Sequence, residues 1–451
     1  MIIYLLLFNL LFGIDNYSYP FPDNPPPEVY KNRRQELLKI LNNNVAYLAF
    51  SSDFYSDNKN DKFRQNSDIL YYTGFPYSKA ILILNKDGIN IDGELKYEIL
   101  LVEKQDNMDI KWNGKRPSKN EIKDFSGINN IYWFNEVDYN DFFNDIIEFN
   151  IAPYTKGSNF LPYAGSSVIP VELDIDFFKS IKDSHPFIVY DIDLRYSKQL
   201  REVKDDYEIK LLKKAVNISV AAHKKVIKNI KNINYEYEIE GIIEGEFKRL
   251  GAENTAYNSI IGSGINSCVL HYTDNRAKVN KGELILFDCG AEYHGYASDI
   301  TRTVPSNGMF SKEQTIIYNI VLEAQKRAIE YCKEGIKFSE IDSVARFVID
   351  SALIDLGLIK NNAQSRLYFP HGTSHYLGLD VHDVATYDRL KAGNCVTVEP
   401  GIYIPEGSDC DKKWWNIGVR IEDDILITKD ACQVLSIDLA KEIKDLEEMM
   451  K

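Results

Sequence analysis

The sequence is poor in the residues that build small metal or disulfide scaffolds. Its 451 residues include only six Cys, none in a CxxC pair, so neither a zinc ribbon nor a thioredoxin-type dithiol is supported. A six-Cys disulfide framework is not expected either, because 44% hydrophobic residues suffice for an ordinary core in a chain this long. We therefore expect buried free thiols.

Positive charge is also scarce. The chain has 53 Lys and Arg against 67 Asp and Glu, a formal net charge of −14 at pH 7. Phosphate backbones bind basic surfaces, so no nucleic acid is expected as a partner. With 27% charged residues, the composition is that of a globular protein of two or three domains and excludes a wholly disordered chain.

Long hydrophobic runs are missing as well. The apolar run at residues 2–12 is too short to cross a bilayer as a helix, which needs about 20 residues, and no later stretch qualifies as an integral membrane span. Its length suits the hydrophobic region of a signal peptide, although no Lys or Arg precedes it. We predict a signal peptide and Pro-rich leader over residues 1–27 and a secreted or periplasmic protein; the alternative is an untargeted, cytoplasmic one.

Strand and helix signals alternate from residue 28 onward, which predicts an α/β (α+β) protein. Over residues 28–198 we expect a mixed sheet covered by helices, with strands at 45–51, 80–84, 99–102 and 187–191 and a turn at Asn85–Gly88. Over residues 199–451 long helices are expected at 205–231, 235–250, 311–334 and 339–356. The third of these begins with the capping-box pair Ser311 and Gln314.

Four carboxylates lie in strand-like segments of the second region. A hairpin centred on Tyr293 and His294 would bring Asp288 and Asp299 face to face. Opposed carboxylates in apolar surroundings repel each other and are costly to desolvate unless a cation lies between them. Glu399 and Glu422 are likewise embedded among β-branched residues. A divalent metal ion accounts for this arrangement.

Histidine is rare but clustered. Three of the seven His, at positions 371, 375 and 382, fall within twelve positions. Imidazole commonly binds first-row divalent metals, although hydrogen-bonded structural histidines are an alternative for this cluster alone. One imidazole nitrogen and up to eight carboxylate oxygens suit two ions such as Mn²⁺, Co²⁺ or Fe²⁺, which can share a hydroxide and so favour hydrolysis. The set is Asp288, Asp299, His375, Glu399 and Glu422.

The ordered motifs resemble the pita-bread metallopeptidases and, among them, the Xaa-Pro aminopeptidase (aminopeptidase P) family. The resemblance runs from about residue 28 to 445 and includes the segments 63–75 and 112–116, which are similar to the N-terminal domain of that family. It implies an aminopeptidase P N-terminal-like domain over 28–198 and a pita-bread catalytic domain over 199–451. The catalytic motifs are Ser298–Thr303, His371–His375, Gly378–Asp383, Val398–Gly401 and Arg420–Asp424.

The resemblance also implies a role for each residue. Asp288 would bind one metal ion, Asp299 and Glu422 would bridge both, and His375 and Glu399 would bind the other. The implied cofactors are two divalent ions, with Mn²⁺ expected, and the implied reaction is hydrolysis of the N-terminal Xaa-Pro bond by a metal-bridging hydroxide.

Further residues are implied to act on the substrate, a peptide with proline at its second position. Glu399 would also be the general base, His382 would stabilise the developing oxyanion, and His271 would contact the leaving side. His371 and Arg420 would line the proline subsite. The other three His match no site position. The resemblance also implies a homodimer or homotetramer, which is common in the family.

Other readings of the same motifs stay open. Xaa-Pro dipeptidase (prolidase) has all five ligands, although Ser374 and the segment 414–420 look more like the aminopeptidase form. Methionine aminopeptidase and creatinase are related as well. A non-catalytic pita-bread scaffold is the remaining alternative. Two departures from the family, Cys395 where Met is common and the longer N-terminal leader, do not touch the predicted ligands.

Overall fold

The computed structural model describes residues 23–52, 63–137, 143, 145–152, 185–192 and 194–451. The chain divides between Tyr196 and Ser197 into two compact units. The predicted signal peptide lies outside the described residues. Among the helices of the described ranges, none is both long and apolar enough to pass through a bilayer.

The first unit is built on a six-stranded mixed sheet with the order β4-β3-β2-β1-β5-β6. Parallel pairs join β3 to β4, β1 to β5 and β5 to β6, and the remaining neighbours are antiparallel. Its apolar core includes the fully buried side chains of β1 and β2. The strands are β1 (Val45–Phe50), β2 (Ala80–Ile91), β3 (Glu94–Val102), β4 (Ile131–Trp133), β5 (Glu148–Ile151) and β6 (Val189–Ile192).

The helices of this unit are α2 (Pro27–Ile40), α3 (Ser67–Thr73), α4 (Asn107–Asn113) and α5 (Lys119–Ser126), and α7 (Arg195–Arg201) spans the division. The predicted turn at Asn85–Gly88 is wrong. Strand β2 continues through it with a bulge between Leu84 and Ile89, and the hairpin turns instead at Asp92 and Gly93, both with positive φ. The residues of the predicted turn form the bulge, so the chain does not reverse there.

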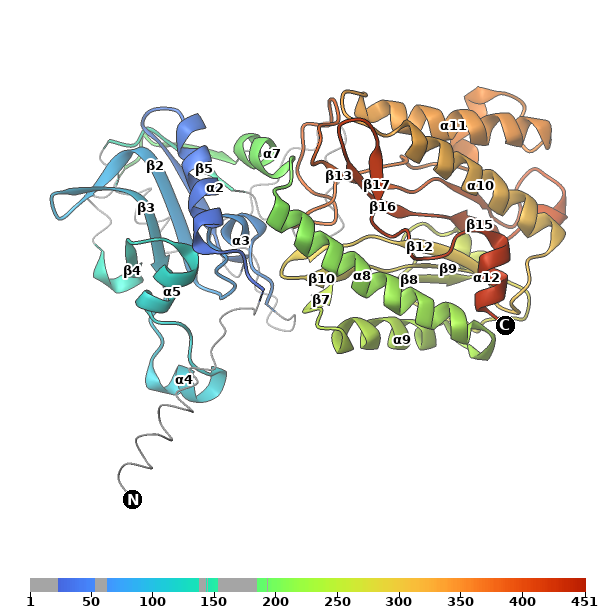
Figure 1. Ribbon diagram of the computed structural model, residues 1–451, viewed down its shortest axis with the longest axis horizontal. Helices are drawn as coiled ribbons and strands as arrows, with labels where there is room; N and C mark the ends of the chain where they lie inside the picture. The colour runs from blue at the N-terminus through green and yellow to red at the C-terminus, as the bar shows by residue number, and fades with distance from the viewer. Residues whose placement is uncertain (1–22, 53–62, 138–142, 144, 153–184, 193) are drawn as a thin grey trace, which may run out of the picture. The chain divides into compact units, whose positions relative to one another are not determined.

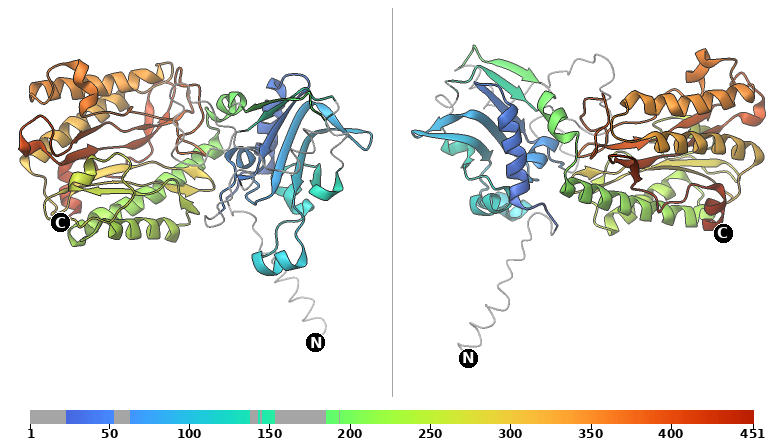
Figure 2. Two further views of the ribbon diagram at one scale, coloured as in Figure 1. Left: turned by 180° about the vertical axis from the view of Figure 1, so that it is seen from behind. Right: turned by 45° about the horizontal axis from the view of Figure 1, so that its top comes forward.

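The second unit has strands between two pairs of long helices, α8 with α9 and α10 with α11, which lie on opposite sides in Figures 1 and 2. All four predicted helices are present, and Ser311 and Gln314 form the expected capping box. The bounds are α8 (Asp206–Asn229), α9 (Glu236–Arg249), α10 (Lys312–Tyr331), α11 (Phe338–Asp355) and α12 (Ile443–Met449).

The strands of this unit form small sheets with the orders β11-β10-β7, β12-β9-β8, β13-β16-β17 and β14-β15. Strands β9, β12, β13, β14, β15 and β16 are buried along their whole length, so they form the inner layer of the unit. The bounds are β7 (Asn254–Thr255), β8 (Ile260–Ser263), β9 (Leu284–Asp288), β10 (Ala291–Tyr293), β11 (Tyr296–Ala297), β12 (Thr301–Pro305), β13 (Cys395–Val398), β14 (Gly401–Ile404), β15 (Ile417–Arg420), β16 (Asp423–Ile427) and β17 (Cys432–Val434). The predicted α/β class with a mixed first sheet is confirmed.

Candidate metal centre

Four of the five predicted ligands lie at or next to strand ends of the second unit. Asp288 ends β9, Asp299 precedes β12, Glu399 follows β13, and Glu422 lies between β15 and β16. His375 stands beside Tyr376, which forms an isolated bridge with Val396 of β13. Inner strands are rigid, so their ends hold side chains in fixed positions.

The hairpin that carries the two aspartates has a different register from the predicted one. It turns at His294 and Gly295, both with positive φ, as a two-residue hairpin turn requires. Asp288 therefore lies opposite Thr301 and not opposite Asp299. The arms cross closely at Gly290, where a Cβ would lie 1.8 Å from the Ser298 carbonyl oxygen, so only glycine fits there.

Tyr257 nevertheless brings the two aspartates together. Its hydroxyl lies 2.5 Å from Asp288 Oδ1 and 2.5 Å from Asp299 Oδ1. One hydroxyl proton cannot serve two carboxylates fully, and burial together with the charges of both aspartates raises the pKa of Tyr257 well above its usual value. Sequence reasoning missed Tyr257, because no motif surrounds it.

His375 occupies the position of a cation among the carboxylates. Its Nε2 lies 3.2 Å from Asp299 Oδ2 and 3.3 Å from Glu399 Oε1, and its Nδ1 donates to the Tyr376 carbonyl at 3.1 Å. Desolvation opposes its protonation, but the hydrogen bond to Asp299 and the charge of Glu399 raise the pKa of His375 to about 9. The Nδ1 bond directs Nε2 at the carboxylates, which is the usual arrangement of a metal-binding imidazole.

The two glutamates are buried beside these groups. Burial, with the charges of Asp299 and Asp288, raises the pKa of Glu399 to about 7 against the attraction of His375. Burial and the neighbouring carboxylates raise the pKa of Glu422 further above its usual value. Asp299, His375 and Glu422 each offer a ligand atom, and these three atoms lie within 4.8 Å of one another. Carboxylates kept at such short range need protons or a cation.

Arg420 connects the carboxylates to His371. The guanidinium donates to Asp288 Oδ2 at 2.6 Å and to the Tyr403 hydroxyl at 2.9 Å, and His371 Nε2 lies 2.8 Å from the same hydroxyl. Desolvation and the charge of Arg420 lower the pKa of His371 to about 3, so this imidazole is neutral. The structure thus brings His371 and Arg420 together through Tyr403, a residue that sequence reasoning did not select.

His382 packs edge-on against His375, with ring centroids 4.3 Å apart. Burial and the charges of His375 and His271 lower the pKa of His382 to about 3, and its Nδ1 has no hydrogen-bond partner in the part of the chain that the structure describes. His271 is exposed, and it lies close enough to His371 and His382 to contribute to the lowering of both pKa values.

The loop that carries His382 is fixed by buried ion pairs. Arg201 donates to Asp380 Oδ2 at 2.8 Å and also contacts Asp383, and Lys204 Nζ donates to Asp383 Oδ2 at 2.8 Å. Because all four charged side chains are at most 5% exposed, these pairs hold both flanks of His382 in one geometry.

Two of the remaining histidines have local partners. His223 is fully buried between the carbonyls of Ser219 and Ile300, and His294 pairs with Glu253 beside the hairpin turn. Their contacts explain their burial without a ligand. His185 belongs to the first unit, whereas the five predicted ligands belong to the second.

Comparisons with known proteins show which families the two parts of the chain resemble. The model of metallopeptidase family M24 matches residues 210–429, and that of the aminopeptidase P N-terminal domain matches residues 30–149. The Xaa-Pro aminopeptidase of Escherichia coli (strain K12) is 33% identical over 436 residues, 93% of this chain and 97% of the relative. The Xaa-Pro aminopeptidase of Haemophilus influenzae is 34% identical over 440 residues, which cover 94% of this chain and 97% of the relative. The solved structure of E. coli aminopeptidase P with the inhibitor Pro-Leu is similar at a TM-score of 0.83 and 31% identity, over 95% of this chain and 98% of that one.

Proposed function

The chain belongs to the Xaa-Pro aminopeptidase family of M24 metallopeptidases, and on that premise we propose that it is a dinuclear-metal aminopeptidase that hydrolyses the N-terminal Xaa-Pro bond of peptides. The observation that carries the proposal is the convergence of Asp299, His375 and Glu422 ligand atoms within 4.8 Å. Glu399 lies 3.3 Å from His375, and the Tyr257 hydroxyl joins Asp288 to Asp299. Metallopeptidases of this family are hydrolases and exopeptidases.

The donor set fits two divalent ions. Asp288 would hold one ion, His375 and Glu399 the other, and Asp299 and Glu422 would bridge them. The raised pKa values of Glu399 and Glu422 fit this arrangement, because a cation relieves the repulsion that otherwise retains protons there. Oxygen-rich ligands favour Mn²⁺, which we propose as the native ion. When bound, the ions would polarise the scissile carbonyl and supply a bridging hydroxide as the nucleophile.

The protein groups around the ions would move protons and orient the substrate. Glu399 lies 3.3 Å from His375 Nε2, beside the place where the nucleophile would be held, so its carboxylate can accept a proton from the nucleophile and return it to the leaving nitrogen. His382 is neutral and can donate one hydrogen bond to the developing oxyanion. His271 would contact the leaving side, and His371 with Arg420 would line the proline subsite.

Proline explains why such a site is useful. The Xaa-Pro bond is a tertiary amide without an N–H, so a peptidase that binds this N–H cannot hold it. Carbonyl polarisation does not require the N–H. The acidic site can also pair with the free amine of the substrate, which would account for cleavage at the N-terminus.

The test is a comparison of hydrolysis rates on Xaa-Pro and Xaa-Pro-Yaa peptides with Mn²⁺, Co²⁺ and Zn²⁺. We expect Xaa-Pro-Yaa to be cleaved, fastest with Mn²⁺, and Glu399→Ala to lower kcat by roughly 10³-fold. Cleavage of dipeptides alone would identify a prolidase instead. Metal binding without hydrolysis of any Xaa-Pro peptide would overturn the catalytic proposal in favour of a binding scaffold.

A further inference from the structure

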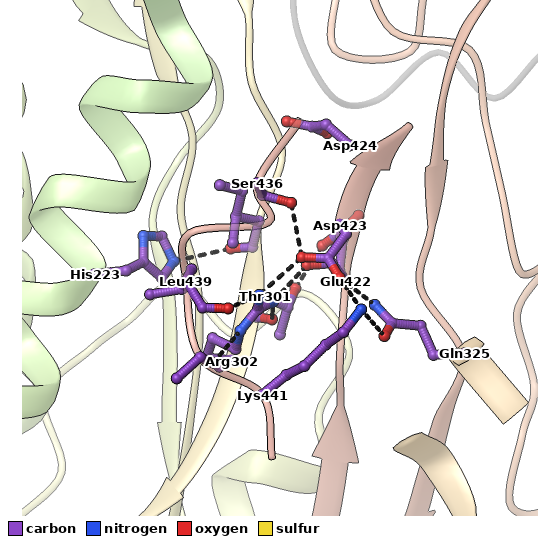
Figure 3. A network of polar contacts seen from close by, with 12 residues as sticks. His223, Thr301, Arg302, Gln325, Glu422, Asp423, Asp424, Ser436, Leu439 and Lys441 are labelled. Atoms are coloured by element: carbon purple, nitrogen blue, oxygen red, sulfur yellow. Dashed lines mark hydrogen bonds and ion pairs between the residues drawn. The ribbon is translucent and has the colours of Figure 1, made fainter. Parts of the chain in front are cut away.

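A second polar cluster, largely buried, adjoins the candidate metal centre at Glu422 (Figure 3). Its cation is Arg302, which is fully buried and uses all five of its N–H groups. They reach the side chain of Asp423 and four backbone carbonyls, those of Thr301, Glu422, Leu439 and Ala440, at 2.6–3.1 Å. A guanidinium satisfied in this way fixes every segment that it touches.

The anion of the cluster is Asp423, whose two oxygens each accept two hydrogen bonds. Oδ1 accepts from Arg302 at 2.7 Å and from Ser436 at 2.7 Å, and Oδ2 accepts from Gln325 at 2.9 Å and from Lys441 at 2.6 Å. We call these five residues the Asp423 clamp. Burial opposes its charge, yet Arg302 and Lys441 lower the pKa of Asp423 to about 2.

The clamp contacts the backbone next to three of the five candidate ligands. Arg302 binds the carbonyl of Glu422 itself at 2.6 Å and that of Thr301, two residues after Asp299, at 3.0 Å. Gln325 binds the carbonyl of Val398, the residue before Glu399, at 3.4 Å. The side chain of Thr301 also donates to Glu422 Oε2 at 2.6 Å. One cluster of hydrogen bonds therefore fixes the backbone beside three carboxylates that come from separate parts of the chain.

Two members of the clamp come from the C-terminal segment beyond the M24 match. That match ends at residue 429, whereas Ser436 and Lys441 follow it and together supply two of the four donors to Asp423. The backbone carbonyls of Leu439 and Ala440 in the same segment accept hydrogen bonds from Arg302. Lys441 also donates to Gln325 Oε1 at 2.9 Å, and its carbonyl accepts from Tyr318 at 2.8 Å.

We propose that the C-terminal segment Ser436–Lys441, through the Asp423 clamp, positions the carboxylates Asp299, Glu399 and Glu422 for metal binding. These are positioning residues, because none of them is a candidate ligand. The inference rests on the proposed metal site. Groups behind the ligands of a metal typically contribute 10–100-fold to its affinity, since they hold the ligands in the required geometry.

The test uses the full-length chain with Lys441→Met, which removes the charge and keeps an unbranched side chain. Mn²⁺ affinity is measured by competition with a chelator, and the Tm of the metal-free protein is measured in parallel. We expect the Kd for Mn²⁺ to rise about 10-fold at temperatures far below the Tm, and peptidase activity to recover as Mn²⁺ is raised. General destabilisation alone would not be reversed by metal in a protein that is already folded.

The matched control is Lys444→Met, which changes an exposed lysine three residues further on and should leave the Kd unchanged. Ser436→Ala removes one neutral donor to Asp423 and replaces Lys441→Met in the experiment if the lysine variant does not fold. A raised Kd for Mn²⁺ in either variant supports the proposal. An unchanged Kd in a folded Lys441→Met, or in Ser436→Ala when the lysine variant does not fold, overturns it. Failure of the wild-type chain to bind Mn²⁺ would instead contradict the proposed metal site itself.

Discussion

Glu422 and Asp423 are consecutive residues, both about 1% exposed, yet their pKa values are shifted in opposite directions. Burial and the charges of Asp299 and Glu399 raise the pKa of Glu422 well above its usual value. Burial acts on Asp423 as well, but Arg302 and Lys441 lower its pKa to about 2. The difference lies in the partners and not in the burial. Asp423 forms direct ion pairs with two cations of the protein, Arg302 and Lys441, whereas the charge of Arg420 only partly offsets the burial of Glu422, which is therefore suited to binding a metal ion.

The same contrast holds for the wider surroundings. On the side of Glu422, Asp288 has Arg420 as a close cation, while Asp424 is fully buried, has a raised pKa, and has one oxygen without a partner in the described ranges. On the side of Asp423, both carboxylate oxygens are saturated by donors. A carboxylate cluster with too few cations costs folding free energy, which a function such as metal binding explains.

The largest expected effect comes from removing Glu422 as a ligand. Glu422→Gln should lower kcat/KM by roughly 10³-fold or more, because a bridging ligand is lost. The metal-free protein should keep its stability within about 1 kcal/mol, since an amide resembles the protonated carboxyl that the raised pKa favours there. Peptide hydrolysis and thermal unfolding of the metal-free form measure the two effects. A large loss of stability without loss of activity would place Glu422 with the structural carboxylates.

The neighbouring residue should respond in the opposite way. Asp423→Asn leaves the buried Arg302 and the partly buried Lys441 without their counter-charge, which should lower the free energy of unfolding by about 3 kcal/mol in the metal-free protein. Denaturant unfolding of the metal-free protein measures this, with Glu422→Gln as the matched control one residue away. Equal stability of the two variants would show that the contrast between these carboxylates has no energetic consequence.

Sequence reasoning selected side chains that the structure brings together, but it did not give their geometry. The His and carboxylate motifs selected residues such as Asp299 and His375, whose side chains lie 3.2 Å apart, because a metal site needs particular side chains. The hairpin register was predicted wrongly by two residues, since a turn at His294 and Gly295 depends on backbone conformation that composition does not reveal. Tyr257 was missed for a related reason. It is brought to the aspartates by tertiary packing, and a single tyrosine outside a motif gives no signal.

The helices of the second unit were easier to predict than its contacts. Long amphipathic segments and the capping box at Ser311 depend on local sequence, so α8 to α11 were found close to their bounds. The Asp423 clamp depends on pairs far apart in the chain, such as Arg302 with Asp423, 121 residues apart, and no local pattern encodes that pairing.

The smallest expected effect is on pH dependence, and it separates the two kinds of carboxylate once more. Metal ions need deprotonated ligands, so Mn²⁺ must displace a proton from Glu399 below its pKa of about 7 and from His375 below its pKa of about 9. The increase in Tm caused by Mn²⁺ should therefore grow from pH 5.5 to pH 8, by about 2 °C per pH unit. Differential scanning calorimetry with and without Mn²⁺ measures it.

In the metal-free protein, the contribution of Glu399 to folding stability should fall as the pH rises, which is the reverse of the Mn²⁺ effect. A carboxyl whose folded pKa is raised stabilises the fold at low pH, and this contribution is lost as pH rises from about 4.5 to about 7. Comparison with Glu399→Gln isolates the group, because the lowered pKa values of His371 and His382 act oppositely over part of the range. Asp423, with its pKa of about 2, stays charged throughout, so Asp423→Asn should leave the pH slope of the Mn²⁺ effect unchanged while Glu399→Gln reduces it. If Asp423→Asn reduced the slope as much as Glu399→Gln, Asp423 would itself release a proton when Mn²⁺ binds, and the distinction between the two kinds of carboxylate would fail.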